Sequence, residues 1–265
     1  MSVTNPERQP GTPQSPAAGV AASLDDGKTH LLLAATGSVA TIKLPLIITA
    51  LSKHPSISIR VILTKSAAHF LPPPTEHAPP HRHEQPTTTT RTTTIASAEA
   101  YLRTLPNIDG VYMDEDEWAE PWTRGGEILH IALRRWAHQL LIAPLSANSL
   151  AKIVHGFADN LLTNVVRAWD ASGAIDGKVD ARIIVAPAMN TAMWVHPVTV
   201  QQIRVLEEEW GVREPELERG PGMVGWFEVL RPIEKSLACG DVGGGGMMEW
   251  TDIVAVVERR LRLKE

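Results

Sequence analysis

Short, uninterrupted apolar runs alternate along the chain with longer stretches in which apolar and polar residues mix. The segments 29–37, 57–71, 138–149 and 181–190 each contain a continuous apolar run, which is typical of a strand buried on both faces of a parallel sheet. The stretch after the first run has helical spacing, with Val39, Ile42 and Leu46 near one face. Repeated alternation of strand and helix predicts an α/β sandwich around one parallel sheet.

Five stretches are predicted to be helical, and a sixth helix begins within 57–71. The five are 38–54, the amphipathic segment 126–138 (GEILHIALRRWAH), 150–170, 196–211 and 251–265. Pro197 is expected to start the fourth of these helices and Gly211 to stop it. Thr251 is expected to be the N-cap of the last helix.

Two segments are expected to lack regular structure. Residues 1–26 are rich in Pro, Ser, Gly and Ala, which predicts a disordered leader before one folded domain over 27–265. Residues 71–94 mix proline, threonine and histidine without an apolar period, which predicts a long surface loop inserted in that domain. The loop's His77, His81 and His83 could form a metal site or be solvated, and the absence of a cysteine partner favours solvated side chains.

Composition narrows the classes of function. Of the 265 residues, 43% are hydrophobic and 21% charged, as expected for a globular protein with a core. The net charge of −5 argues against nucleic acid or an anionic membrane as partner, because both attract clustered Lys and Arg. No apolar run approaches the roughly 20 residues needed to span a bilayer. The single cysteine, Cys239, allows no internal disulfide, which favours a reducing, cytoplasmic location.

The candidate chemistry follows the predicted strands. Four strand ends, ATGSVA, LTKSAAHF, APLSANS and APAMN, carry small hydroxyl- or amide-bearing residues and precede a helix. In open parallel sheets ligands bind beyond these carboxyl ends, and the N–H groups of a helix start, as after Gly37 and Ser38, favour a phosphate. Each turn could equally be a simple N-cap, but four together favour a phosphorylated cofactor. The spacing is not G-x-G-x-x-G, so a dinucleotide is not indicated.

Further candidates are less distinctive. Asn190, directly after a strand, could bind a carboxylate or amide, or it could be a turn residue. The glycine-rich segment 237–250 predicts a mobile flap, on which Cys239 could donate a proton or act as nucleophile. A buried structural thiol is the alternative. His130 and His138 lie on one predicted helix, where a lone histidine is more often structural than catalytic.

In combination these residues resemble the homo-oligomeric flavin-containing cysteine decarboxylase family. Four motifs in the family's order carry the resemblance: TGSVA with KLPL; LHIALRRWA; APLSANSLAKI with DNLLTNVVRAWD; and PAMNTAMWVHP with LACGDVGGGGM. The similarity extends from about His30 to Val257. It implies a Rossmann-like, flavodoxin-type three-layer sandwich, a cytoplasmic homotrimer and FMN at the subunit interface. The implied reaction converts 4′-phosphopantothenoylcysteine to 4′-phosphopantetheine and carbon dioxide, a step of coenzyme A synthesis.

The resemblance also assigns residues, and it implies no metal. His130 matches the active-site histidine, Asn190 the residue that holds the substrate carboxylate, and Cys239 the flap proton donor. Ala238 and Met247 match positions against the substrate. The positions that match flavin-contacting segments are Gly37, Ser38, Thr64, Lys65, Ser66, Phe70, Ser146, Ala147, Asn148 and Ser149.

Two other functions are compatible with the same fold. Fungal relatives of this family act as inhibitory subunits of a protein phosphatase, typically with a strongly acidic C-terminal tail. The present sequence ends in LRLKE without an acidic run and combines His130, Asn190 and Cys239, which favours a self-sufficient decarboxylase, although a dual role stays open. Related flavoenzymes act on peptidyl cysteine or prenylate flavin, and the LACGD motif argues against prenylation.

Overall fold

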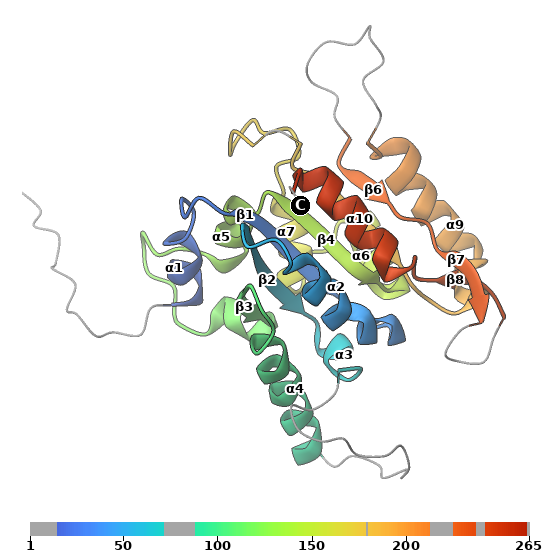
Figure 1. Cartoon of the computed structure of the whole chain (residues 1–265), viewed down its shortest axis with the longest axis horizontal. Coiled ribbons are helices and arrows are strands. Elements are labelled where there is room, and N and C mark those ends of the chain that lie inside the picture. Colours follow the sequence, from blue (N-terminus) through green and yellow to red (C-terminus); the bar gives the residue numbers. More distant parts are fainter. Residues whose placement is uncertain (1–14, 72–87, 179, 213–224, 237–241, 264–265) are drawn as a thin grey trace, which may run out of the picture.

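A six-stranded parallel sheet forms the centre of the molecule (Figure 1). The computed structural model of the chain describes residues 15–71, 88–178, 180–212, 225–236 and 242–263. The strands are β1 (Thr29–Ala35), β2 (Ile57–Leu63), β3 (Ile108–Tyr112), β4 (Gln139–Leu145), β5 (Ile183–Pro187) and β6 (Phe227–Val229). Their order is β3-β2-β1-β4-β5-β6, and all neighbours run parallel. The direction in which strands are added reverses between β1 and β4, as in a Rossmann-like sheet.

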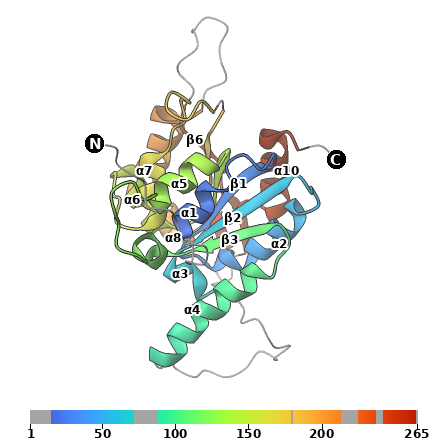
Figure 2. The ribbon, with the colours of Figure 1, turned by 90° about the vertical axis from the view of Figure 1, so that its left-hand side faces the viewer.

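Helices cover both faces of the sheet. They are α1 (Pro16–Ala21), α2 (Leu44–Leu51), α3 (Lys65–Ala68), α4 (Thr88–Arg103), α5 (Leu129–Trp136), α6 (Ala147–Val154), α7 (Leu161–Ala168), α8 (Thr191–Trp194), α9 (Pro197–Arg204) and α10 (Trp250–Leu261). Among the described residues there are also two 3₁₀ helices, η1 (Val39–Lys43) and η2 (Asp114–Trp118), and a π-helical turn, η3 (Val205–Glu209). Figures 1 and 2 show α2 and α10 on one face of the sheet and α5 to α7 on the other.

The alternation of side chains along the strands divides the core in two. In β1, Leu32 and Ala34 belong to a cluster with α1, α5, α6, α7 and α9. Leu31 and Leu33 belong to a second cluster with α2, α3, α4 and α10. Because both faces of the strand are buried, every residue from His30 to Ala35 must be compatible with a core, which explains the continuous apolar run. The predicted three-layer α/β sandwich is confirmed.

Several predicted helix boundaries are wrong. The stretch 150–170 contains two helices, α6 and α7, because Gly156 takes φ +74° after α6 and Asn160 caps a new helix by accepting a hydrogen bond from Thr163 N. The last helix begins at Trp250, so Thr251 lies inside it and is not its N-cap. Pro197 does start α9, as predicted.

Both segments expected to be irregular contain helix where the structure describes them. Within the predicted leader, Pro16–Ala21 form α1, whose Ala17 and Val20 are buried in the core cluster that contains α5. Within the predicted loop, α4 begins at Thr88 and continues into buried Ala98 and Leu102. Packing of these apolar residues outweighs the weak helix propensity of the threonine run. Residues 1–14 and 72–87 lie outside the described part of the chain.

The glycine-rich segment forms a strand in its described part. Strand β8 (Val242–Gly246) pairs antiparallel with β7 (Ile233–Ser236). Gly245 has φ +108°, and a Cβ there would lie 2.6 Å from Met189 O. The glycines therefore allow the strand to pack closely on the turn that follows β5. Val242–Gly246 thus form a paired strand within the predicted flap, and the mobility of the flap stays a prediction. Residues 237–241, with Ala238 and Cys239, lie outside the described residues.

Candidate active site

A cavity of about 860 Å³ lies at the carboxyl ends of the parallel strands. Turns after β1, β2, β4 and β5 line it, together with residues 245–250 at the end of β8. This is the edge where the strand order reverses between β1 and β4, and such reversals leave a crevice between diverging connections. All ten predicted cofactor residues line this one cavity: Gly37, Ser38, Thr64, Lys65, Ser66, Phe70, Ser146, Ala147, Asn148 and Ser149.

Thr36 joins the two connections that diverge at the reversal. Its hydroxyl donates to Pro144 O at 2.9 Å and accepts from Ser146 N at 2.7 Å. Its own backbone N–H donates to Pro144 O at 3.1 Å. Thr36 is fully buried, so these bonds are shielded from water and fix the turn after β1 against the turn after β4.

Helix starts converge on the cavity. Five lining residues, Ser38, Thr64, Ser146, Asn160 and Asn190, are N-caps whose side chains accept a backbone N–H of the first helical turn at 2.8–3.4 Å. The remaining N–H groups of each first turn have no partner within their helix, and the helix dipole places partial positive charge there. The two interpretations of these turns, N-cap and ligand site, are therefore compatible, and the arrangement suits an anionic ligand.

Gly37 allows two of these turns to approach each other. A Cβ at this position would lie 2.6 Å from the Cβ of Ser66, closer than real Cβ atoms approach. The turn after β1 and the start of α3 can meet at this distance because residue 37 has no side chain. Residue 37 must be glycine because of this steric contact and not because of its backbone conformation, since its φ is not in the left-handed region.

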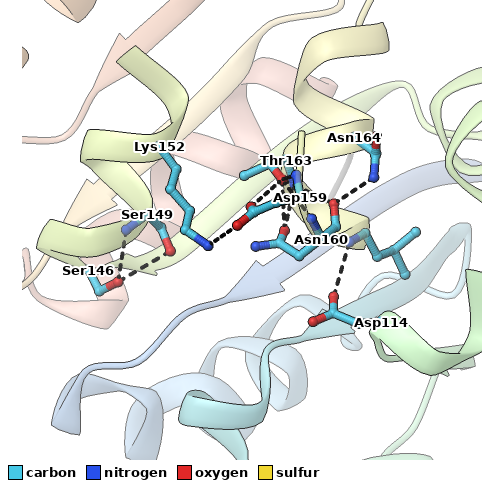
Figure 3. A network of polar contacts seen from close by, with 9 residues as sticks. Asp114, Ser146, Ser149, Lys152, Asp159, Asn160, Thr163 and Asn164 are labelled. Atoms are coloured by element: carbon cyan, nitrogen blue, oxygen red, sulfur yellow. Dashed lines mark hydrogen bonds and ion pairs between the residues drawn. The ribbon is translucent and has the colours of Figure 1, made fainter. Parts of the chain in front are cut away.

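A polar network on one wall was not predicted from the sequence (Figure 3). Asp114 Oδ1 accepts from Leu161 N at 3.0 Å, and Lys152 Nζ lies 2.6 Å from Asp159 Oδ2. Burial raises the pKa of Asp114, and the hydrogen bond from Leu161 opposes that shift. The hydrogen bond from Lys152 lowers the pKa of Asp159. A sequence signal that could have indicated this wall is the N-x-x-T spacing that starts at Asn160, which is a capping-box pattern.

Two predicted substrate residues also line the cavity. Asn190 uses Oδ1 to accept from Met193 N at 2.8 Å, which leaves its Nδ2 amide as a donor for a ligand. Met247 is buried in the core cluster on the α10 face and contributes to the lining. The other predicted substrate and flap residues, Ala238 and Cys239, lie outside the described residues.

The two histidines of α5 and its C-terminal flank differ in surroundings. His130 Nδ1 lies 2.7 Å from Glu117 Oε1, and the described lining of the cavity does not include His130. His138 lies at the amino end of β4, where its Nδ1 accepts from His30 N at 2.9 Å. Burial, assisted by the charges of Lys178 and His30, lowers the pKa of His138 to about 4. These contacts indicate a structural role for His138.

Two further types of site are absent from the described residues. No group of three or more His, Cys, Asp or Glu residues within them could hold a metal ion, and His77, His81 and His83 lie outside them. No helix in the described part of the chain is long and apolar enough to cross a membrane.

Comparison with known proteins places the chain in a family. Residues 20–262 match the family described as Flavoprotein. A mouse protein named phosphopantothenoylcysteine decarboxylase is 36% identical over 88% of this chain and 88% of its own length. The yeast Saccharomyces cerevisiae protein named Coenzyme A biosynthesis protein 3 is 37% identical over 89% of this chain, which spans 34% of that relative.

Solved structures agree with this placement. A PPC decarboxylase mutant complexed with pantothenoylaminoethenethiol superposes with a TM-score of 0.62 at 35% identity, covering 88% of this chain and 97% of that one. The FMN-binding protein AtHal3 superposes with a TM-score of 0.60 at 35% identity, covering 90% of this chain and 99% of that one. The chain belongs to the flavoprotein family.

Proposed function

We propose that the chain binds FMN and decarboxylates 4′-phosphopantothenoylcysteine to 4′-phosphopantetheine, a step of coenzyme A synthesis. The observation that carries this proposal is the convergence of capped helix starts and Asn190 on one cavity at the strand-order reversal. The names of two relatives support it, phosphopantothenoylcysteine decarboxylase and Coenzyme A biosynthesis protein 3. The single cysteine favours a cytoplasmic location.

The residues of the cavity fit FMN. Its volume of about 860 Å³ lies within the range of small-molecule and cofactor sites. The backbone N–H groups that follow Ser38 and Ser146 are suited to a phosphate, and Gly37 removes the side chain that would obstruct the turn after β1. We expect FMN to be held by the ten lining residues 37, 38, 64–66, 70 and 146–149.

The chain's own groups then orient the substrate and move protons. Asn190 Nδ2 would bind the substrate carboxylate before carbon dioxide leaves, as a neutral donor at the cavity wall. Met247 would pack against the substrate. The Nε2 atom of His130 would take or hold the proton at the reacting thiol end, and Cys239 would return a proton to the product. When bound, FMN supplies a reversible two-electron sink, which a simple carboxylate lacks.

The position of His130 leads to a proposal about assembly. His130 is not among the described residues that line its own chain's cavity, so we propose that a second copy brings its His130 to this site within a homotrimer. Mixing the severely impaired His130→Asn and Asn190→Asp chains tests this. Random mixing in equal amounts would restore about one quarter of wild-type activity, because one site in four pairs an intact histidine with an intact asparagine. No recovery on mixing would contradict a shared site.

The activity itself is tested with the purified chain and no added partner. The absorbance spectrum should show bound flavin, and addition of 4′-phosphopantothenoylcysteine should yield 4′-phosphopantetheine and carbon dioxide. A flavin-containing protein without turnover would contradict the decarboxylase and favour a regulatory subunit, such as one binding a protein phosphatase. A protein without flavin would contradict the cofactor assignment.

A further inference from the structure

Glu117 holds His130 through both of its carboxylate oxygens. Oε1 lies 2.7 Å from His130 Nδ1, and Oε2 accepts from the backbone N of His130 at 3.2 Å. The Glu117 side chain is 2% exposed and that of His130 is 19% exposed. A buried carboxylate with both oxygens on one residue has little freedom to turn away, so it fixes the imidazole in one orientation.

We propose that Glu117 is a positioning residue for the decarboxylation, acting through His130. The inference rests on the proposed function, in which His130 acts on the substrate. A carboxylate accepts hydrogen bonds, so the neutral imidazole carries its proton on Nδ1 and presents an unprotonated Nε2. The geometry thereby assigns Nε2 as the reactive nitrogen. A carboxylate that orients a catalytic base in this way also stabilises the imidazolium that forms when the base takes a proton.

The element that carries Glu117 is itself held on both sides. η2 begins after Met113, whose N–H donates to Asp116 Oδ2 at 2.7 Å. Asp114, at the start of η2, accepts from Leu161 N at the start of α7. These bonds set the rotation of the short helix, and with it the direction of Glu117. The same helix therefore presents Asp114 to the cavity and Glu117 to His130.

The neighbouring Glu115 shows that a glutamate in the acidic run DEDE does not make a buried contact like that of Glu117 with His130 simply by being there. Glu115 pairs with Lys65, and both side chains are more than half exposed, at 60% and 57%. Exposed pairs of this kind contribute little, since solvent screens them. Glu117, two residues later, is buried and bound to one histidine. The acidic run DEDE thus contains one carboxylate with the burial and geometry of a positioning residue.

Glu117 also has a structural role that a test must separate. The N-cap of α5, Ile128, offers no side-chain acceptor, and Glu117 Oε2 accepts the N–H of the second helical residue instead. Loss of the carboxylate would weaken the start of α5 as well as the orientation of the imidazole. Glu117→Gln retains an amide oxygen that can accept from Nδ1, whereas Glu117→Ala retains nothing.

The kinetic test uses these two variants, the His130→Asn variant and a control. Glu117→Ala is expected to lower kcat about 100-fold with KM changed less than about threefold, in the range of general acid–base contributions. Glu117→Gln should recover part of this loss, to about tenfold below wild type. Glu120→Gln, an exposed glutamate just after η2, should leave kcat unchanged. If Glu117 acts through His130, Glu117→Ala should cost nothing further in the His130→Asn background. If Glu117→Ala lowered kcat by the same factor in the His130→Asn background as in the wild type, the proposal would be overturned.

A second readout does not depend on turnover. In ¹⁵N-histidine-labelled wild type, with His130 assigned from the His130→Asn variant, the neutral ring should show the proton on Nδ1. In Glu117→Ala it should shift towards the Nε2–H form. A wild-type ring with its proton on Nε2 would overturn the positioning role. If the ring is held as expected while the wild type fails to decarboxylate the substrate, the proposed function fails and the Glu117–His130 geometry stands.

Discussion

The two ends of the parallel sheet both gather polar and titratable side chains, and they use them differently. At the amino ends of β1 and β4, His30 bonds Asp26 Oδ1 at 2.8 Å and Trp136 O at 3.0 Å. Its ring also stacks on the Trp136 ring with the two centroids 4.4 Å apart, and its backbone N–H donates to His138 Nδ1. At the carboxyl ends, each N-cap uses one acceptor for its helix and faces a cavity of about 860 Å³.

The comparison shows what distinguishes a functional site from a polar core. Both ends have buried hydrogen bonds, so burial and polarity do not separate them. At the amino end, both ring nitrogens of the fully buried His30 have partners, and packed side chains occupy the surrounding space. At the carboxyl end, open volume and unused donors such as Asn190 Nδ2 remain. Unused hydrogen-bonding capacity beside open space is the property that identifies the carboxyl end as the site.

The largest expected effect is at the carboxyl end. Asn190→Asp keeps an oxygen that can cap α8 but places a negative charge against the substrate carboxylate. Like charges brought together cost several kcal/mol, so we expect kcat/KM to fall on the order of 10³-fold. Flavin absorbance and urea stability should stay near wild type. A loss of stability in place of activity would contradict the binding role of Asn190.

At the amino end of the sheet we expect the opposite result, a loss of stability with activity unchanged. His30→Ala removes a stacked, fully hydrogen-bonded ring and should lower the free energy of unfolding by about 3 kcal/mol, from cavity formation and unsatisfied partners. The kcat/KM of the folded protein should be unchanged. Urea unfolding at one fixed protein concentration measures the first, and the standard assay measures the second. A large fall in kcat/KM would mean that the two ends do not differ as described.

A smaller effect is expected where the turns meet at the cavity. Gly37→Ala forces the turn after β1 away from Ser66 and should weaken FMN binding about tenfold, equivalent to about 1.4 kcal/mol. Gly19→Ala is the matched control, because a Cβ there has nothing within 4 Å and Gly19 lies in α1. The control should leave FMN binding unchanged and stabilise the helix by up to about 1 kcal/mol. Equal FMN affinity in both variants would refute the steric account of Gly37.

The smallest effect is a pH dependence of stability at the amino end. The pKa of His138 is about 4 in the folded protein against 6.5 for an ordinary histidine. Between these values the unfolded chain binds more protons, so stability should fall as pH drops from about 6.5 to about 4. Because the imidazole is partly exposed, we expect a loss of about 1 kcal/mol or less.

The hydrogen bond from His30 N to His138 Nδ1 gives this shift a structural cause, since Nδ1 must be unprotonated to accept it. His138→Asn removes the titration and offers a neutral acceptor. The difference between the wild-type and His138→Asn urea midpoints should therefore change between pH 6.5 and pH 4. A constant difference would show that His138 does not titrate in this range.

The sequence was informative where local pattern determines position. Carboxyl ends of parallel strands meet at one edge, so the strand pattern alone was enough to assign residues as distant as Gly37 and Ser149 to one cavity. The contact of Glu117 with His130, and that of Lys152 with Asp159, depend on how η2 and the α6–α7 turn pack. The hydrophobic periodicity of the sequence carries no information about how η2 and the α6–α7 turn pack. Strand β8 was missed because glycine disfavours strands, and close contact with Met189 and Trp194 outweighs that preference.

The most direct test of the account is whether the cavity at the carboxyl edge recognises a phosphorylated flavin. Flavin-free protein is titrated with FMN and with riboflavin, and binding is followed by quenching of flavin fluorescence. Hydrogen bonds to a charged group contribute roughly 1.5–3 kcal/mol each, so the phosphate should make FMN bind at least about 100-fold more tightly than riboflavin. Equal affinities for FMN and riboflavin would contradict the assignment of the converging helix starts as a phosphate site.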